Sequence, residues 1–596
     1  MSNGMSGLYV GTSGLSAAQA ALNTTANNLA NINTVGYTRQ QITYITSNYY
    51  NVGNNATGKL VCGTGVDVSE IRRVRDELID KAYRQEKGRL GYYDSQYDAV
   101  TEVESLFGEL DDNSFQNTMT DLYNSIKEIG KNPASTIARS SLLQTASAFV
   151  DKASSVYSSL KDYQTTLNTK ITNMVNKINS LGQTICDLNK KILDVECVGQ
   201  KANDLRDKRD NALDELSGYI KIQYQEDKNG SITVTAEGAT FVSKDSICAM
   251  GTEEIAGTDL LKPVWPLIDN RDVFLDAEKI TVIDNNDVGE LKGLLISRGY
   301  KAVNYSDVPV EPTIPDASSY NMTDATQLAA YQAAKDKYDV DYKQYESDCD
   351  YYNKYIDPSV ILSTMASLDK LTNGIVTAIN DILCPEKTAS FTAADGTVYT
   401  DATILDLEKT SYGDDTDKSV GVELFSRKNT DRYIKVTGND GSTYYVRNNK
   451  NDLGLNSEYT LGNIQMNETA TQNKATIPLT TARGEEDFDK GKALVDAWNV
   501  KFASLNPSTY AKENFDTFYN SLVTEYADTG SILKNMVTNQ TTMADGYNGQ
   551  RLQTEGVSSD EELQNMIKFQ QAYNAASRYV SIVSDMLEQI VTRLGN

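Results

Sequence analysis

The stretch "NNLANINTVGYTRQ" (residues 27–40) decides the fold, because it ends a helical repeat with a cluster of amide side chains. The repeat before it advances in steps of three and four residues, at Leu8, Gly11, Leu15, Ala18, Leu22, Thr25, Leu29 and Ile32. Polar residues flank these positions, so the apolar stripe is narrow, as in a coiled-coil seam. Asn33 and Gly36 leave helical geometry easily, and we expect the helix to end there.

The C-terminal segment carries a stripe of the same kind. Its positions alternate by three and four residues and are Met566, Phe569, Tyr573, Ala576, Val580, Val583, Leu587, Ile590 and Leu594. Ser558 or Ser559, followed by acidic residues at 561 and 562, is typical of a helix start. The chain therefore begins and ends with single-stripe amphipathic helices.

A narrow stripe needs a partner, because one helix cannot bury it alone. The simplest arrangement pairs the two ends with each other or with neighbouring chains. Within one chain, we expect one set of side chains to pack against the other: Leu15, Leu22, Leu29 and Ile32 against Val580, Val583, Leu587 and Leu594. The alternative is that each terminal helix docks separately on a globular body.

A longer seam lies further inside the chain, at Leu167, Ile171, Met174, Ile178, Leu181, Ile185, Leu188, Ile192 and Val195. With a lead-in from about residue 160, it predicts a helix on the order of 50 Å long. A late segment with Phe515, Phe518, Leu522, Leu533 and Met536 near helical spacing is its expected partner. In "NDLRDKRDNALDELSGYI" (203–220), we expect the ion pairs Asp204–Lys208 and Arg206–Asp210 along the helix surface.

The central part of the chain changes character after Gly218. Alternating polar and apolar residues surround Asn-Gly at 229–230 and Asp-Gly at 395–396 and 440–441, which predicts three β-hairpins. Segments 291–300 and 360–383 are helical by pattern. A segment rich in Tyr and Asp, about 320–357, is either a helical excursion or an irregular insert.

These segments follow a nested order of helix, helical rod, β modules, helical rod and helix. It predicts a multidomain α+β protein, with a coiled-coil-like helical base formed by both termini and β-rich outer domains inserted between the helical arms. We divide the chain into a terminal axial core (1–60 with 545–596), a helical rod (61–218 with 485–544), a β-rich or mixed outer part (219–310 with 358–484) and the Tyr/Asp-rich insert (311–357).

Composition excludes several classes of function. The chain has 56 Lys and Arg against 82 Asp and Glu, and this net charge of −26 argues against nucleic acid and anionic membranes as partners. No segment is apolar over the length needed to span a bilayer, and the N-terminus does not resemble a cleavable secretory signal. No cysteine spacing or acidic motif predicts a metal or cofactor site.

The sequence contains no histidine, which removes Ser-His-Asp and Cys-His catalysis. Carboxylate pairs need no histidine, so a glycosidase carried on the outer modules is the enzymatic alternative. It would require a cleft with two carboxylates about 5–10 Å apart. The main expectation is a structural protein without catalytic residues.

Both ends resemble the axial proteins of the bacterial flagellum. The segment "SGLSAAQAALNTTANNLANINTVGYTRQ" (13–40) is similar to the opening motif of rod and hook proteins, and residues 555–594 are similar to the closing helix of the same family. The segment "NDLRDKRDNALDELSGYIKI" (203–222), after a long helical segment, is similar to the hook-associated members at the hook–filament junction. Another axial protein, of the hook or filament type, is the alternative within this family.

The resemblance implies a secreted, extracellular protein of the flagellum, exported by the flagellar type III route without a cleaved signal peptide. It implies a ring of sister subunits between the hook protein and the second hook-associated junction protein. It also implies an export chaperone that holds the C-terminal helix before secretion. It implies no enzymatic activity and no cofactor.

The resemblance implies that copies of the protein form a section of the flagellar tube, in which the terminal helices pack against neighbouring copies around a wet central channel. We expect the amides of the opening stretch to face neighbours, lumen or turn, since amides donate and accept hydrogen bonds without bringing charge into an interface. The alternative, simple helix-ending residues, explains only Asn33 and Gly36. The expected assembly residues are Leu15, Leu22, Asn27, Asn28, Leu29, Asn31, Ile32, Asn33, Gly36, Tyr37, Phe569, Tyr573, Val580, Val583, Leu587, Ile590 and Leu594.

An isolated copy is expected to leave these ends disordered. A stripe without its partner buries too little surface to offset about 1–2 kcal/mol of backbone ordering per residue. Assembly would then supply the folding, and slow amide exchange of residues 15–32 in the monomer would count against this expectation.

Overall fold

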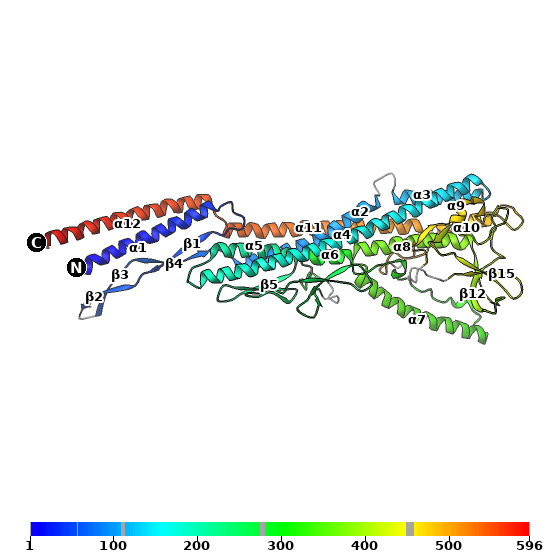
Figure 1. Ribbon diagram of the computed structural model, residues 1–596, viewed down its shortest axis with the longest axis horizontal. Helices are drawn as coiled ribbons and strands as arrows, with labels where there is room; N and C mark the ends of the chain where they lie inside the picture. Colours follow the sequence, from blue (N-terminus) through cyan, green and yellow to red (C-terminus); the bar gives the residue numbers. More distant parts are fainter. Residues whose placement is uncertain are drawn as a thin grey trace.

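The computed structural model describes residues 2–55, 58–108, 114–274, 280–448, 458–509 and 511–594. The molecule is elongated, with both termini at one end and β-rich structure at the other (Figure 1). The middle of the chain lies furthest from the termini, as the nested order of segments predicts. Helices and inserted antiparallel sheets alternate along the chain, which confirms the expected multidomain α+β class.

The terminal helices α1 (Ser2–Ala30) and α12 (Ser559–Leu594) lie side by side and antiparallel (Figure 1). We call them the terminal pair. Two antiparallel ladders accompany α1. One joins β1 (Gln40–Thr46) to β4 (Val66–Arg73), and the other joins β2 (Tyr49–Asn55) to β3 (Gly58–Gly63).

The rod is built on α4 (Thr136–Glu196), a helix of 61 residues and therefore about 90 Å long. It extends well beyond the predicted start near residue 160, because Ser135 caps its first turn by accepting from the Ala138 amide. Its first part buries small residues such as Ala146 and Ala153, which do not stand out as a stripe in the sequence. Short helix α3 (Phe115–Lys131) packs against α4 far from the termini.

The partner predicted for this long helix is wrong. The late helix α11 (Phe515–Glu555) packs chiefly against α2 (Glu77–Phe107), antiparallel to it, and not along α4. Phe107 of α2 stacks on Tyr526 of α11 with ring centroids 5.3 Å apart. The apolar spacing of the late segment is less regular than that of α4, so periodicity alone could not fix its partner.

Asparagines fasten α4 to the sheets beside it. The Asn189 side chain donates to the Ile232 carbonyl at 2.8 Å and accepts from the Ile232 amide at 3.1 Å. Asn179 makes the same pair of bonds with the Met250 backbone, both at 2.9 Å. The strands held in this way belong to two antiparallel sheets: β5 (Ile222–Glu226), β6 (Ile232–Ala236) and β7 (Ala239–Val242), then β8 (Gly251–Glu254), β9 (Leu261–Trp265) and β10 (Arg271–Asp272).

Helix α5 (Asn203–Tyr219) precedes these sheets, and α6 (Glu290–Arg298) follows them. The predicted hairpin at residues 229–230 is confirmed, because Glu226 of β5 pairs with Ile232 of β6 around a turn in which Gly230 has a φ of 81°.

The outer end combines α8 (Val360–Leu383) and α10 (Phe488–Trp498) with a four-stranded antiparallel sheet. The strands in the order β11-β12-β15-β14 are Glu386–Thr392, Val398–Leu405, Thr443–Arg447 and Tyr433–Thr437. Both predicted hairpins in this region are confirmed. A short ladder of β13 (Phe425–Arg427) and β16 (Ile464–Met466) and helix α9 (Glu468–Gln472) complete it.

The Tyr/Asp-rich segment is a helical excursion. Helix α7 (Ala325–Tyr355) extends away from the rod and is exposed over almost all its length (Figure 1). Tyr352, near its end, is the residue of α7 that the structure buries. The division of the chain into four parts remains a proposal, and its boundary at 544/545 falls inside the continuous helix α11.

Candidate functional site: the terminal pair and its joint

The seam of the terminal pair is formed by small residues on α1 and larger ones on α12. A Cβ atom added at Gly11 would lie 2.7 Å from a methyl of Val580, and one added at Gly14 would lie 3.8 Å from Ala576. The predicted stripe of α12 faces this seam but is only half-buried, at Met566, Phe569, Tyr573, Ala576, Val580, Val583 and Leu587. Two helices therefore cover each other incompletely.

The predicted pairing of Leu15, Leu22, Leu29 and Ile32 with Val580, Val583, Leu587 and Leu594 is wrong. Because the helices are antiparallel, Val580 and Val583 lie against Gly7 and Gly11 near the start of α1. The other end of α1 lies against the first turn of α12, so Leu29 is far from Leu587. Ile32 follows the end of α1 and is exposed, as is Ile590, while the side chain of Leu594 lies outside the described residues.

The side chain of Asn28 joins three segments. It is 2% exposed, its Nδ2 donates to the Gln40 carbonyl at 2.9 Å and to Glu562 Oε2 at 3.2 Å, and its Oδ1 accepts from the Gln40 amide at 3.0 Å and the Tyr37 hydroxyl at 2.9 Å. All the hydrogen-bonding capacity of the amide is used. Asn28 therefore locks the end of α1 to β1 and to α12.

The other amides have lesser roles. Asn27 is exposed and donates to the Tyr37 hydroxyl at 3.3 Å, and Asn31 donates back to the Asn27 carbonyl at 3.0 Å. Asn33 is exposed. Burial, with Asp204, Asp207 and Glu562 nearby, raises the pKa of Tyr37 well above its usual range, so its hydroxyl keeps its proton as a donor.

After α1 the chain docks on one face of α5, which we call the α5 seat: Asn203, Asp204, Asp207 and Asn211. The Thr38 amide donates to Asp207 at 3.0 Å, Gln40 Nε2 to Asp204 at 3.0 Å, and Asn211 Nδ2 to the Val35 carbonyl at 3.2 Å. Gly36 has a φ of 74°, and a Cβ there would lie 1.9 Å from Asn211 Oδ1. Glycine is therefore required at position 36 for two reasons: the backbone has a positive φ, and the Asn211 side chain leaves no room for a Cβ atom.

We call the docking of residues 34–40 on the α5 seat the joint. Arg39 connects this joint to the two late helices α11 and α12. Its amide donates to the Glu555 carbonyl at the end of α11, at 2.8 Å. Its guanidinium lies 3.0 Å from Glu561 and 3.1 Å from Glu562 in the first turn of α12. One residue thus spans the break between α11 and α12 and holds the two helices in a fixed relation.

A network of buried ion pairs lies behind this joint. Its members are Arg73, Arg75, Arg84 and Arg551 with Asp80, Asp207, Asp210, Asp214 and Glu555. Asp210 lies 2.7 Å from Arg73 and 2.9 Å from Arg75. Burial would raise the pKa of Asp210, but the guanidiniums of Arg75, Arg73 and Arg84 outweigh it and lower this pKa to about 2.

The surface ion pairs predicted on α5 are therefore wrong. Asp210 turns inward to the arginines of β4 and α2, and Arg206 bonds Glu196 at 2.7 Å and Glu226 at 2.6 Å. The signal that could have revealed this is the density of charge in a helix that also carries buried leucines at 213 and 216. Charges on such a helix cannot all reach solvent.

The terminal pair also exposes large apolar side chains outside the seam, which we call the outer face: Tyr9 and Val10 on α1, and Leu563, Ile567, Ile582, Met586, Ile590 and Val591 on α12. Tyr579 is 44% exposed but lies against Gly7 and Gly11 of α1 and belongs to the seam. Ile582 and Met586 are 52% and 57% exposed. Large apolar side chains left exposed in this number on one helix pair favour a protein–protein contact there.

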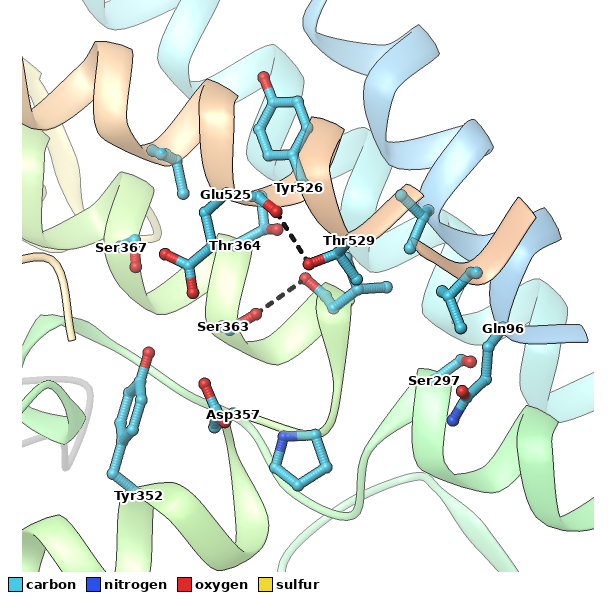
Figure 2. A pocket seen from close by; sticks show the side chains of 15 residues that line it. Gln96, Ser297, Tyr352, Asp357, Ser363, Thr364, Ser367, Glu525, Tyr526 and Thr529 are labelled. Carbon is cyan, nitrogen blue, oxygen red and sulfur yellow. Dashed lines mark hydrogen bonds between the residues drawn. The ribbon is translucent and has the colours of Figure 1, made fainter. Parts of the chain in front are cut away.

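A separate cavity of about 350 Å³ lies between α2, α8 and α11 and is lined by no residue of the terminal pair (Figure 2). Asp357 and Glu525 are its carboxylates. Burial raises the pKa of both, and Asp357 adds to the rise at Glu525. A glycosidase pair needs one carboxyl that stays protonated and one that stays ionised. Here both shift the same way for the same cause, so the cavity does not favour the enzymatic alternative.

Over the described ranges, no group of three or more Cys, Asp or Glu side chains is placed to hold a metal ion. Likewise, none of the helices that the structure describes combines the length and apolar character needed to cross a bilayer.

Comparison with known proteins matches three parts of the chain to flagellar families. Residues 100–334 match the flagellar hook-associated protein FlgK helical domain, residues 8–38 the flagella basal body rod protein family, and residues 549–593 the C-terminal region of the flagellar basal body rod FlgEFG proteins. The last two ranges are the helices of the terminal pair with part of the joint.

Full-length relatives agree with these matches. The flagellar hook-associated protein 1 of Bacillus subtilis (strain 168) is 26% identical over 100% of this chain and 99% of its own length. The flagellar hook-associated protein 1 of Salmonella typhimurium is 24% identical over 97% of this chain and 98% of its own length. A solved structure, the flagellar hook junction protein FlgK from Burkholderia pseudomallei, is 13% identical with a TM-score of 0.48, covering 79% of this chain and 99% of its own.

The antiparallel terminal pair and the matched ends define an axial structural protein of the bacterial flagellum. Within that class, the chain belongs to the flagellar hook-associated protein 1 family.

Proposed function

We propose that this chain is the structural adaptor of the hook–filament junction and that it polymerises as a ring through its terminal pair. The observation that carries the proposal is the outer face of that pair. Its apolar side chains are exposed in the single chain, and the seam beneath them is only half-buried. Sister copies placed side by side would cover both.

The energetics support assembly at this place. An isolated two-helix pair gains little from helix propensity alone, and most helical stability in proteins comes from packing an apolar face. Covering a large apolar side chain contributes about 1.5–3 kcal/mol. Covering several such side chains per copy therefore favours assembly at this place.

The partners follow from the family. Below the ring lies the hook protein, and above it the second hook-associated junction protein. Before assembly, an export chaperone holds the C-terminal helix, and the chain leaves the cell by the flagellar type III route without cleavage of a signal peptide. The role needs no catalytic residue, cofactor or metal.

Purified protein added to isolated hook fragments tests the proposal directly. Wild-type protein should cap the hook tips and then accept the second junction protein. Ile582→Asp, which places a charge on the outer face, should reduce capping at least tenfold. Val340→Asp is the matched control, because Val340 is 67% exposed on α7, away from the terminal pair. Equal capping by Ile582→Asp and wild type would exclude the outer face as the assembly surface.

A further inference from the structure

The rod carries a second unpartnered helix face, on α11. Two repeats in steps of four and three residues run along this helix, one residue out of phase. The inner repeat is buried or half-buried and comprises Leu533, Val537, Gln540, Ala544, Tyr547 and Arg551. The outer repeat, which we call the α11 outer seam, comprises Ile532, Met536, Asn539, Met543, Gly546 and Gln550, all exposed.

The inner repeat is accounted for within the chain. Arg551 lies 3.1 Å from Asp80 of α2 and 4.6 Å over the ring of Tyr83. No other part of the described chain covers the outer seam, since the side chains of Ile532, Met543 and Met536 are 58%, 45% and 37% exposed.

The composition of this segment is unusual for a solvent-exposed helix. The stretch "NMVTNQTTMADGYNGQ" (535–550) contains one charged residue, Asp545, in a chain that is 23% charged. Asp545 lies about 140° around the helix from the seam at 100° per residue. A solvated helix face normally carries charged side chains, so this one is composed like an interface.

Gly546 adds to this pattern. A glycine inside a helix lowers stability relative to alanine, and a Cβ added at Gly546 meets nothing within 4 Å. The chain itself does not require a glycine there. A backbone that approaches closely from outside would require it.

We propose that the α11 outer seam is covered by the rod of a sister copy. This inference rests on the proposed ring and extends its interface from the terminal pair into the rod. Two features select a sister copy as the occupant. Helix α11 leads directly into α12 along the long axis, so copies that cover the outer face of α12 also run beside α11 (Figure 1). A chain of net charge −26 can approach its own copy closely only where the facing surface is uncharged.

Methionine oxidation of the full-length protein by hydrogen peroxide tests the inference, because exposed methionines oxidise and covered ones do not. In the monomer, Met536, Met543 and Met586 should all react. In the ring on isolated hooks, all of them should react at least tenfold more slowly. Met322, exposed beside α7, is the access control and should change less than twofold.

Each outcome is decisive. Protection of Met586 without protection of Met536 and Met543 would overturn the α11 seam and leave the proposed ring intact. Reactivity of Met586 in the ring would contradict the terminal-pair interface, and the seam inference would fall with it.

A substitution provides an independent readout. Gly546→Ala should raise the Tm of the monomer, since alanine favours the helix, and yet weaken ring formation at least fivefold by blocking close approach. Thr538→Ala, about 120° around α11 from the centre of the seam at 100° per residue, is the control and should leave ring formation unchanged. Ring formation by Gly546→Ala equal to that of wild type would contradict the inference.

Discussion

Substitution of Asn28 by alanine should loosen the joint far more than the same substitution of its neighbour Asn27. Asn28 is buried and bonds both the amide and the carbonyl of Gln40. Asn27 is exposed, and its side chain donates to the Tyr37 hydroxyl at 3.3 Å and accepts from Asn31 Nδ2 at 3.0 Å, both within reach of solvent. In Asn28→Ala the Gln40 amide and the Tyr37 hydroxyl lose their acceptor. An unpaired buried group costs about 1–3 kcal/mol. The Tyr37 hydroxyl is only half-buried and can bond water instead, so we expect about 2–4 kcal/mol in total.

The assay is hydrogen exchange of the Gln40 amide, whose bond to Asn28 Oδ1 is 3.0 Å. A loss of about 2–4 kcal/mol corresponds to exchange about 30- to 1000-fold faster, while Asn27→Ala should change it by less than about fivefold. Both substitutions raise helix propensity equally, so the comparison isolates the buried bonds. Equal effects of the two substitutions, or a change below threefold for Asn28→Ala, would refute the assignment of Asn28 as the lock of the joint.

Two further predictions concern the same region. Because the pKa of Asp210 falls from its ordinary value of 3.8 to about 2 on folding, the carboxylate contributes stability that is present above pH 3.8 and lost as the pH falls through 2. We expect a loss of about 2 kcal/mol over this window in urea unfolding followed by circular dichroism, and Asp210→Asn should flatten it; an unchanged pH profile in that variant would contradict the prediction. Gly36→Ala should cost about 2–4 kcal/mol, from backbone strain and from the clash with Asn211, whereas Gly199→Ala, with a φ of 83° and open space around its Cβ, should cost about 1 kcal/mol. Similar shifts in Tm for the two glycine variants would show that the seat does not need the close approach.

Periodicity predicted the terminal helices, the long α4 seam and the turns of the three hairpins, because each depends on local spacing or on a residue with a special φ. It could not choose between partners, because a stripe shows that a helix is covered but not by what. That is why the prediction pairs α11 with α4 instead of α2, and why it places Val580 and Val583 against the wrong part of α1. Antiparallel packing reverses the order of partners, and nothing in either stripe encodes direction.

The joint could not be predicted because its parts are far apart in the sequence. The α5 seat lies more than 160 positions from Val35, Thr38 and Gln40, which it binds; the bond from Asn211 to Val35 has a separation of 176. The charges of α5 suggested surface pairs four residues apart, and burial of that helix redirected them to arginines of β4 and α2. Only the tertiary structure shows that the opening stretch and the α5 segment, each similar to a flagellar motif, form one contact.

This contact defines the role of the amides. Of the three expected surroundings, neighbours, lumen or turn, Asn28, the buried amide, faces the turn: it bonds the Gln40 backbone and Tyr37 within its own chain, where residues 34–40 dock on α5. Order at the ends should therefore begin at the joint and decrease toward the termini. In the monomer, slow exchange should be confined to residues near Asn28 and Gln40, with residues 8–20 exchanging fast until a ring forms. Uniform exchange over residues 8–40 in the monomer would show that the joint does not nucleate the terminal pair.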